Sequence, residues 1–227
     1  MALTVYEDLE QGSEEWLQAR AGIVTASTVG QLITTKTLKT AQNDTARGLV
    51  STLVAERITG HVEEIFPNRD MQRGTLSEPY AREIYEQHYA ATSEVGFMVR
   101  DDWGFKIGYS PDGLVGDDGL IEIKSPRQKT HLNTLLTDMV PIHYMAQCQT
   151  EMLVSGREWV DFISYNSGMP FFVKRVHPDE QWREAIVNAV KGFESDAAAL
   201  METYQLRIKG RPQTERIDVF EEEEIRI

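Results

Sequence analysis

Apolar residues recur at helical spacing in four segments of the chain. Helices are therefore expected over residues 43–59, 76–89, 141–154 and about 179–205. Asn43 or Asp44 can cap the first of these helices. Pro79 would fall in the first turn of the second helix, where its missing N–H is tolerated.

Between the second and third helices the apolar period shortens to the alternation that is typical of strands. Short strands are expected over residues 95–100, 104–110 and 119–124, separated by the runs DDWG and GDDG, which are typical of tight turns between antiparallel strands. A second strand pair is expected in EWVDFISYN and PFFVKRVH, joined at Asn166, Ser167 and Gly168. This order of elements predicts a mixed α/β fold with a central mixed sheet flanked by helices.

The composition is that of an ordinary folded protein. The chain has 227 residues, of which 41% are hydrophobic, and no Gly/Ser-rich or Pro-rich run divides it, so one domain over 1–227 is expected. Residues from about 207 to 227 could form a C-terminal extension or tail that ends in the acidic run Glu221 to Glu224. There is neither a long apolar stretch nor an export-like start, so a cytoplasmic protein outside the membrane is expected.

Charge and cysteine content exclude further classes. The formal net charge of −13 argues against generic adhesion to nucleic acid, because such binding depends on Lys and Arg neutralising phosphates. Carboxylates gathered at a metal site would, however, add negative charge while they attract cations. The single cysteine, Cys148, rules out an intramolecular disulfide and a four-cysteine metal site within one chain, and it is expected to be a small buried side chain.

The densest polar chemistry lies in the stretch GYSPDGLVGDDGLIEIKSP, residues 108–126. Alternation along the last strand points Glu122 and Lys124 away from the core, and a tight turn would bring Asp112 to the same face. Two carboxylates beside an ammonium group could hold a hard cation such as Mg²⁺ and act on a phosphoryl group. The alternative is a solvent-facing strand with a Glu/Lys pair. An EF-hand fails, because Leu114 and Gly116 offer no side-chain oxygens.

The SPDG run at Ser110–Gly113, followed by EIK at Glu122–Lys124, resembles the PD-(D/E)xK nuclease superfamily. Three further segments are similar to motifs of the lambda exonuclease and YqaJ-type viral recombinase family: WLQARAGIVTAS (Trp16–Ser27), RGTLSEPYAREIYE (Arg73–Glu86) and YMAQCQTEM (Tyr144–Met152). The motifs occur in the order of the family. The resemblance implies the restriction-endonuclease-like core of that superfamily.

The resemblance also implies a metal site. By match to the family motifs, Asp112 and Glu122 would be metal ligands, with the backbone carbonyl of Ile123 completing the shell. Glu78 would reach a second ion or its waters from a neighbouring helix. The resemblance implies two Mg²⁺ ions per active site, with Mn²⁺ as a substitute.

The remaining matched residues would act on the substrate. Lys124 would act on the attacking water, and Gln147 would position water or substrate. Arg20, Ser27 and Ser110 match positions that hold a terminal 5′ phosphate, which suits an arginine fork and two hydroxyl groups. Taken singly, each has an ordinary structural interpretation, such as a helix-surface residue or a cap.

The function implied is a magnesium-dependent 5′-to-3′ exonuclease on double-stranded DNA. It would release 5′ mononucleotides and leave 3′ single-stranded overhangs for phage-type recombination, as a ring-shaped homotrimer that encloses DNA and works with a single-strand annealing protein. The alternatives are another nuclease of the superfamily, such as an endonuclease or a repair exonuclease, and a noncatalytic module that binds DNA ends or a partner.

A few other residues have open or minor expectations. Met71, seven residues before Glu78, could be an apolar wedge that parts the duplex end or could simply pack. Trp16 and Trp182 are expected as core aromatic residues rather than base-stacking platforms. No catalytic role is expected for the histidines, which lack metal-binding spacing.

Overall fold

The computed structural model describes residues 2–63 and 66–217. One four-stranded sheet has the order β1-β5-β6-β2 and consists of β1 (Leu3–Tyr6), β2 (Val24–Thr25), β5 (Phe97–Arg100) and β6 (Ile107–Tyr109). A second has the order β10-β9-β8-β7 and consists of β7 (Gly113–Val115), β8 (Gly119–Lys124), β9 (Trp159–Ser164) and β10 (Phe172–Val176). A small third sheet pairs β3 (Ile33–Thr34) with β4 (Lys39–Thr40).

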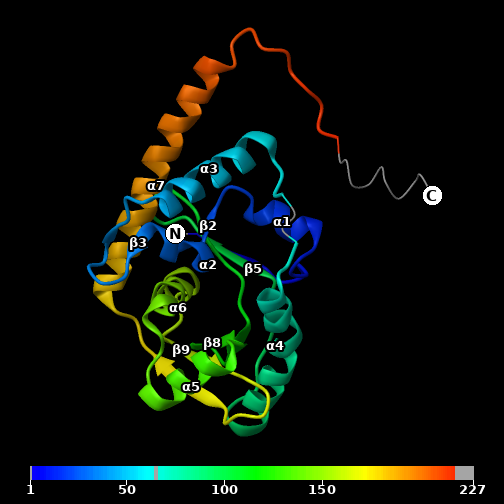
Figure 1. Cartoon of the computed structure of the whole chain (residues 1–227), viewed down its shortest axis with the longest axis vertical. Helices are drawn as coiled ribbons and strands as arrows, with labels where there is room; N and C mark the ends of the chain where they lie inside the picture. Colours follow the sequence, from blue (N-terminus) through cyan, green and yellow to red (C-terminus); the bar gives the residue numbers. More distant parts are fainter. Residues whose placement is uncertain (1, 64–65, 218–227) are drawn as a thin grey trace, which may run out of the picture.

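The helices lie around these sheets (Figure 1). They are α1 (Glu14–Arg20), α2 (Ala26–Val29), α3 (Asp44–Thr59), α4 (Arg69–His88), α5 (Gln128–Thr137), α6 (Ile142–Ser155) and α7 (Glu180–Arg207), with a 3₁₀ turn at Gly30–Leu32. Helix α6 contacts β5 and β6 of the first sheet and β9 of the second, so it links the two sheets within the main core. The mixed α/β fold flanked by helices is confirmed, but the strands divide into two four-stranded sheets and a small two-stranded one instead of forming one central sheet.

Helix α4 lies along one side of the molecule and has its own small core (Figure 1). Its buried residues are Ala81 and Tyr85. They pack with apolar side chains of the second sheet, namely Val115, Ile121, Ile123 and Ile163. This contact fixes one face of α4 against β8, which carries the acidic stretch singled out above.

The expected hairpins are confirmed. Strands β5 and β6 pair antiparallel across the DDWG turn, β7 and β8 across the GDDG turn, and β9 and β10 across the loop that contains Gly168. Strands β8 and β9 are parallel, so β8 is paired on both sides and is central in its sheet.

The second helix differs most from its expected bounds. It begins at Arg69 instead of Leu76, because the side chain of Asn68 caps it by accepting bonds from the N–H groups of Asp70 and Met71. Pro79 therefore lies inside the helix, and not in its first turn as expected. Residues 69–75 contain a single large apolar side chain, Met71, so they show no apolar period.

Helix α5 was not expected, because its buried face is polar. Its buried residues are His131 and Thr134. The ring of His131 contacts the Ser164 hydroxyl through Nδ1 at 2.7 Å and the Pro170 carbonyl through Nε2 at 2.9 Å. Since the carbonyl can only accept, Nε2 donates the hydrogen bond to Pro170.

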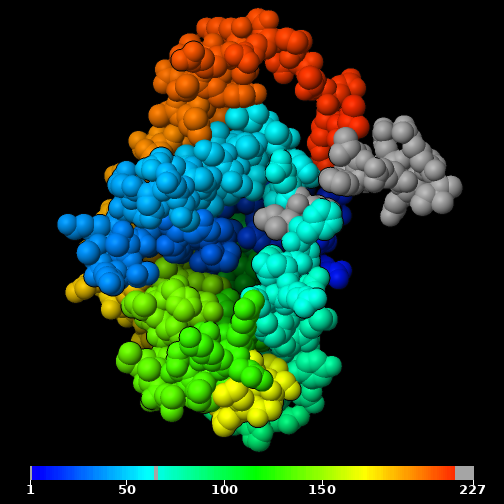
Figure 2. All heavy atoms as spheres, viewed as in Figure 1, coloured from blue at the N-terminus to red at the C-terminus, as the bar shows by residue number. Residues whose placement is uncertain are grey.

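Other expectations can be checked directly. Cys148 and Trp182 are buried as expected. Helix α7 extends two residues beyond its expected end, and the residues after it project past α3 (Figure 2). The acidic run Glu221 to Glu224 lies outside the described residues. Within the described residues, no helix is long and apolar enough to cross a membrane.

Candidate active site

The β7–β8 hairpin brings two of the expected carboxylates together. Asp112 precedes β7, and its Oδ2 accepts a hydrogen bond from the backbone N–H of Ile123 in β8 at 2.7 Å. Glu122 lies in the centre of the same strand and is only 1% exposed. The solvent-facing alternative for this strand is therefore wrong, since Glu122 is a buried carboxylate in a central strand.

Glu122 has two partners on one oxygen and none on the other. The ammonium of Lys124 forms an ion pair with its Oε1, and Nε2 of Gln147 in α6 donates to the same oxygen at 2.6 Å. Its Oε2 is buried and has no hydrogen-bond partner in the described structure. The expected set of Asp112, Glu122, Lys124 and Gln147 is thus assembled from β8, the segment before β7, and α6.

Lys124 remains a cation in this surrounding. Burial alone would lower the pKa of Lys124, but the charges of Glu122 and Asp112 outweigh burial and raise it. Its Nζ also lies 5.7 Å from the centre of the Tyr144 ring, a favourable cation–π arrangement. Lys124 is consequently suited to donate hydrogen bonds and to stabilise negative charge, and not to accept a proton.

For the Asp112 carboxyl group, in contrast to Lys124, the surroundings disfavour the charged form. Burial, followed by the neighbouring charge of Glu122, raises the pKa of Asp112 well above its ordinary value. Its bond from the Ile123 N–H and the charge of Lys124 oppose this rise without cancelling it. Additional positive charge at this position would favour the ionised carboxylate.

Glu78 approaches the cluster from α4. Burial raises the pKa of Glu78, the charge of Arg82 opposes the rise, and the charge of Glu122 adds to it. The Glu78 carboxylate accepts a bond from Arg82 at 2.6 Å. Because α4 begins at Arg69, Glu78 lies in the interior of the helix and is half-buried.

Glu151 belongs to this region but was missed in the sequence. It lies on α6 one turn after Gln147, is fully buried, and finds no hydrogen-bond donor for either carboxylate oxygen in the described structure, but its carboxyl group lies within hydrogen-bonding reach of the Glu122 carboxyl group. Burial and then the charge of Glu122 raise the pKa of Glu151 well above its ordinary value. Its spacing of four residues from Gln147 was the available signal, because such residues share a helix face.

The donor chemistry of the cluster fits a hard divalent cation. Asp112 and Glu122 supply carboxylate oxygens, and the buried, unpartnered Oε2 of Glu122 is an acceptor that a cation would satisfy. Within residues 2–63 and 66–217, no three Asp, Glu, His or Cys side chains are already arranged to hold an ion. In this structure Lys124 and Gln147 contact one oxygen of Glu122, and Arg82 pairs with Glu78.

Two of the three expected phosphate-binding residues meet at Trp16. The guanidinium of Arg20 lies over the Trp16 ring, 4.1 Å from its centre, and Nε1 of Trp16 donates to the Ser110 hydroxyl at 3.0 Å. Burial lowers the pKa of Arg20, opposed by the charge of Glu56. Trp16 is half-buried with a polar contact, so its interpretation as a core aromatic residue is wrong.

Ser27 is placed by the parallel pairing of β2 and β6. Thr25 lies opposite Gly108, and Ser27 and Ser110 each follow two residues later, so both leave the sheet at the same edge. The described contact of the exposed Ser27 hydroxyl is with the Thr25 hydroxyl, at 3.0 Å. The fold thus brings Ser27 and Ser110 to one edge, and Trp16 connects Ser110 to Arg20.

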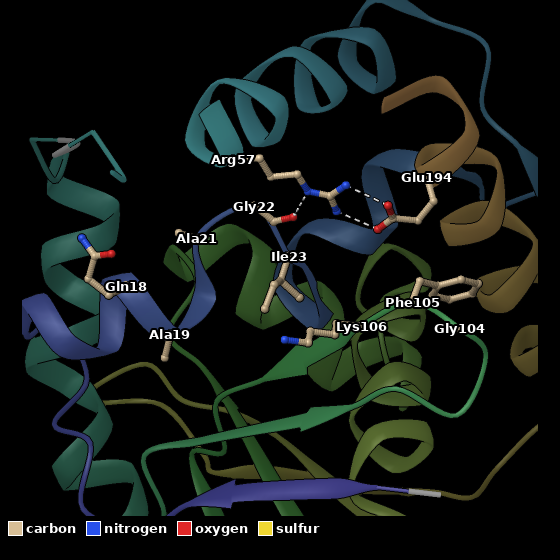
Figure 3. Close-up of a pocket in the computed structure, with 10 residues that line it drawn as sticks. All are labelled: Gln18, Ala19, Ala21, Gly22, Ile23, Arg57, Gly104, Phe105, Lys106 and Glu194. Atoms are coloured by element: carbon tan, nitrogen blue, oxygen red, sulfur yellow. Dashed lines mark hydrogen bonds and ion pairs between the residues drawn. The ribbon is translucent and has the colours of Figure 1, made fainter. Parts of the chain in front are cut away.

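A cavity of about 400 Å³ is lined by the end of α1 and the residues after it, by α3, by α7 and by the residues just before β6 (Figure 3). Arg57 crosses it, donating to both carboxylate oxygens of Glu194 at 2.7 Å and to the Gly22 carbonyl at 2.8 Å. Gly22 is required here, because its φ is +66° and a Cβ would lie 2.4 Å from Cγ of Arg57. None of the expected site residues lines this cavity.

The mixed α/β fold is that of the lambda-exonuclease-like nuclease structures. An alkaline exonuclease from Laribacter hongkongensis is 36% identical, with a TM-score of 0.76 over 86% of this chain and 97% of that chain, and its complex with dAMP gives the same values. The YqaJ-like viral recombinase domain matches residues 15–158, and the chain belongs to that family.

Two further comparisons set the limits of this similarity. A phage-related exonuclease from Haemophilus somnus 129PT is 15% identical, with a TM-score of 0.59 over 79% of this chain and 96% of that chain, and therefore shares the fold alone. A search of curated proteins found no match. The family resemblance expected from the four sequence motifs is confirmed.

Proposed function

We propose that this protein is a metal-dependent exonuclease that digests one strand of double-stranded DNA from its 5′ end, releases 5′ mononucleotides and leaves a 3′ overhang. The observation that carries the proposal is the buried Glu122, paired with Lys124 and Gln147 and adjacent to Asp112. Burying two carboxylates costs free energy unless they are paired, hydrogen-bonded or bound to a metal ion, so a cluster of this kind indicates a binding site. The similar exonuclease structures supply the reaction class.

The proposed chemistry is attack of water on the scissile phosphorus, in line with the departing 3′ oxygen. Asp112, Glu122 and the Ile123 carbonyl would hold one Mg²⁺ ion, and Glu78 would reach a second ion or its waters. When bound, the cation supplies positive charge that polarises the phosphoryl group. Lys124, kept charged by Glu122, would orient the attacking water or stabilise the negative charge that develops on the phosphate. Gln147 would hold Glu122 in place while it positions water or substrate.

The proposed polarity rests on Arg20, Ser27 and Ser110 as a pocket for the 5′ phosphate. A terminal phosphate has more negative charge and more acceptor oxygens than a diester, so an arginine with two hydroxyls can distinguish an end from an internal position. The contact of Trp16 with both Arg20 and Ser110 supports this grouping. The complex of the similar alkaline exonuclease with dAMP supports a mononucleotide product.

The substrate and assembly complete the proposal. Met71 is 47% exposed in the first turn of α4, which supports a wedge against the duplex end more than core packing.

A ring of three chains would enclose the DNA, so that few basic side chains line one channel while acidic ones face outward. A single-strand annealing protein would receive the 3′ overhang in phage-type recombination. Sedimentation that shows only monomers during processive digestion would contradict the ring.

The test is a time course on blunt linear duplex DNA labelled at either the 5′ or the 3′ end, with and without a 5′ phosphate. We expect early release of the 5′ label as a mononucleotide, faster digestion of phosphorylated ends, and complete loss of activity in EDTA. Mn²⁺ in place of Mg²⁺ should restore digestion. Covalently closed circular DNA is the control and should remain intact.

The same assay separates the alternatives. Cleavage of the closed circle would indicate an endonuclease, and early release of the 3′ label would indicate an exonuclease of opposite polarity. Failure to release any nucleotide with Mg²⁺ or Mn²⁺, while DNA ends are still bound, would indicate a noncatalytic module. Asp112→Ala, Glu122→Ala and Lys124→Ala should each abolish cleavage without unfolding the protein.

A further inference from the structure

Arg82 of α4 links three segments around the acidic cluster. Its Nη2 donates to the Glu78 carboxylate at 2.6 Å, its Nη1 to the Glu94 carboxylate at 2.6 Å, and its Nε to the backbone carbonyl of Asp112 at 3.0 Å. The guanidinium group is planar and has donors in a fixed fork. Three acceptors that bind one such group are therefore held at defined positions relative to one another.

Two of these acceptors belong to residues assigned to the metal site. Glu78 comes from a helix, whereas Asp112 lies in the connection between β6 and β7, so only tertiary contacts set the separation of their side chains. The Arg82 side chain is 16% exposed, compared with 70% for its outer partner Glu94. The bonds to Glu78 and Asp112 are accordingly the more protected ones.

Arg82 contacts the backbone carbonyl of Asp112 and makes no hydrogen bond to its carboxylate. That carboxylate is held separately, by the Ile123 N–H at 2.7 Å. Arg82 therefore fixes the main chain that carries Asp112 without neutralising the ligand group, and it holds one oxygen of Glu78. This is the arrangement expected of a residue that positions ligands.

We propose that Arg82 is a positioning residue that sets the separation of Glu78 from Asp112 and thereby determines how tightly the site binds divalent cations. The inference rests on the proposed function, because it takes these two carboxylates as metal ligands. Arg82 does not touch the reacting atoms in this role. Its removal should weaken the site even when the rest of the fold is intact.

The experiment is a Mn²⁺ titration of the protein without DNA, followed by electron paramagnetic resonance of the free ion. Arg82→Ala should weaken Mn²⁺ binding by about 10-fold to 100-fold, the usual effect of removing a group that orients metal ligands. Arg82→Lys should recover part of the loss, because an ammonium can bind Glu78 but cannot reproduce the fork. Glu94→Gln removes the outer ion pair alone and should bind Mn²⁺ within about twofold of wild type, since exposed pairs contribute little.

The Mn²⁺ concentration that half-activates DNA digestion should rise in parallel with the binding constant. Binding by folded Arg82→Ala equal to that of wild type would overturn the inference, as would equal weakening in Glu94→Gln. If Arg82→Ala does not fold, Arg82→Gln provides the same comparison, with wild-type binding again overturning it. The absence of Mn²⁺ binding by the wild-type protein would instead refute the proposed function, so the two failures are distinguishable.

Discussion

Neutralising Asp112 should stabilise the metal-free protein while it abolishes cleavage. Asp112→Asn keeps the size of the side chain, and the amide oxygen can still accept the N–H of Ile123. The substitution removes a charge that burial and Glu122 disfavour, as the raised pKa of Asp112 indicates. If the surroundings of Asp112 instead favoured its charged form, Asp112→Asn would lower the stability of the protein.

The size of the effect is the balance of two losses, the attraction of Lys124 and part of the Ile123 hydrogen bond, against one gain, the relief of desolvation and repulsion. A hydrogen bond to a charged acceptor contributes roughly 1.5 to 3 kcal/mol and a neutral one about 1 kcal/mol, so the Ile123 bond loses about 1 kcal/mol. Relief of desolvation and repulsion amounts to several kcal/mol per ion, and the direction of the Asp112 pKa shift shows that this contribution is the larger one. We expect a net gain of about 1 to 3 kcal/mol in the free energy of unfolding, or roughly 2 to 12 °C in Tm for a chain of this length.

The pH dependence gives a second check on the sign. A carboxyl group whose pKa is raised by folding costs nothing below its unfolded pKa of about 4, where it is protonated in both states. The cost grows as pH rises toward the folded pKa. The Tm difference between Asp112→Asn and wild type should therefore vanish near pH 4 and be largest at neutral and alkaline pH.

The assay is thermal unfolding by circular dichroism in EDTA at several pH values, with DNA digestion measured in Mg²⁺. Asp117→Asn, an exposed position in the turn of the same hairpin, is the matched control and should change stability by no more than about 0.5 kcal/mol. Excess Mg²⁺ should stabilise wild type and leave Asp112→Asn nearly unchanged. A lower Tm for Asp112→Asn in EDTA at pH 7, or wild-type digestion, would refute the reasoning.

Three other variants test separate parts of the structure. Arg20→Ala should slow digestion of phosphorylated ends by about tenfold to a hundredfold, and removal of the 5′ phosphate should have a similar effect. The two losses should not multiply, because they remove the two halves of one interaction. Multiplicative losses in single-turnover rates would show that Arg20 does not bind the 5′ phosphate. Glu151→Gln should raise the Tm in EDTA by an amount that grows with pH above about 4, because the pKa of Glu151 is raised by burial; a gain that is largest at acid pH would contradict this. Tyr85→Phe should destabilise the fold by about 1 to 3 kcal/mol in urea unfolding, since its hydroxyl donates to the buried Asp161 at 2.8 Å; an unchanged midpoint would show that the bond contributes nothing.

The hairpin and its carboxylates were predictable because their signals are local. The GDDG turn, the alternation in LIEIK and the spacing of Asp112 from Glu122 all lie within residues 108–126. A short turn fixes the register of two strands, and register decides which side chains share a face. The approach of Asp112 to β8 followed from these rules alone.

Long-range contacts were not predictable in the same way. The bond of Trp16 to Ser110 spans 94 residues, and that of Arg82 to Asp112 spans 30. Such pairs depend on how β2 meets β6 and how deeply α4 packs, which no local pattern specifies. Glu151 was missed for a related reason: an acidic residue on a helix is ordinarily exposed, so only the tertiary packing of α6 reveals that its carboxyl is buried.

The burial of acidic groups also explains how the fold and the proposed activity depend on each other. Glu122 and Glu151 are buried side by side with oxygens that no hydrogen-bond donor reaches, and ionisation of Asp112 is unfavourable, so the acidic cluster destabilises the metal-free chain. A cation bound there would relieve that cost and stabilise the folded state in proportion to its occupancy. Residues that hold the cluster in place, such as Arg82 and Gln147, then matter twice, because they limit the strain of the metal-free state and preset the distances that a cation requires.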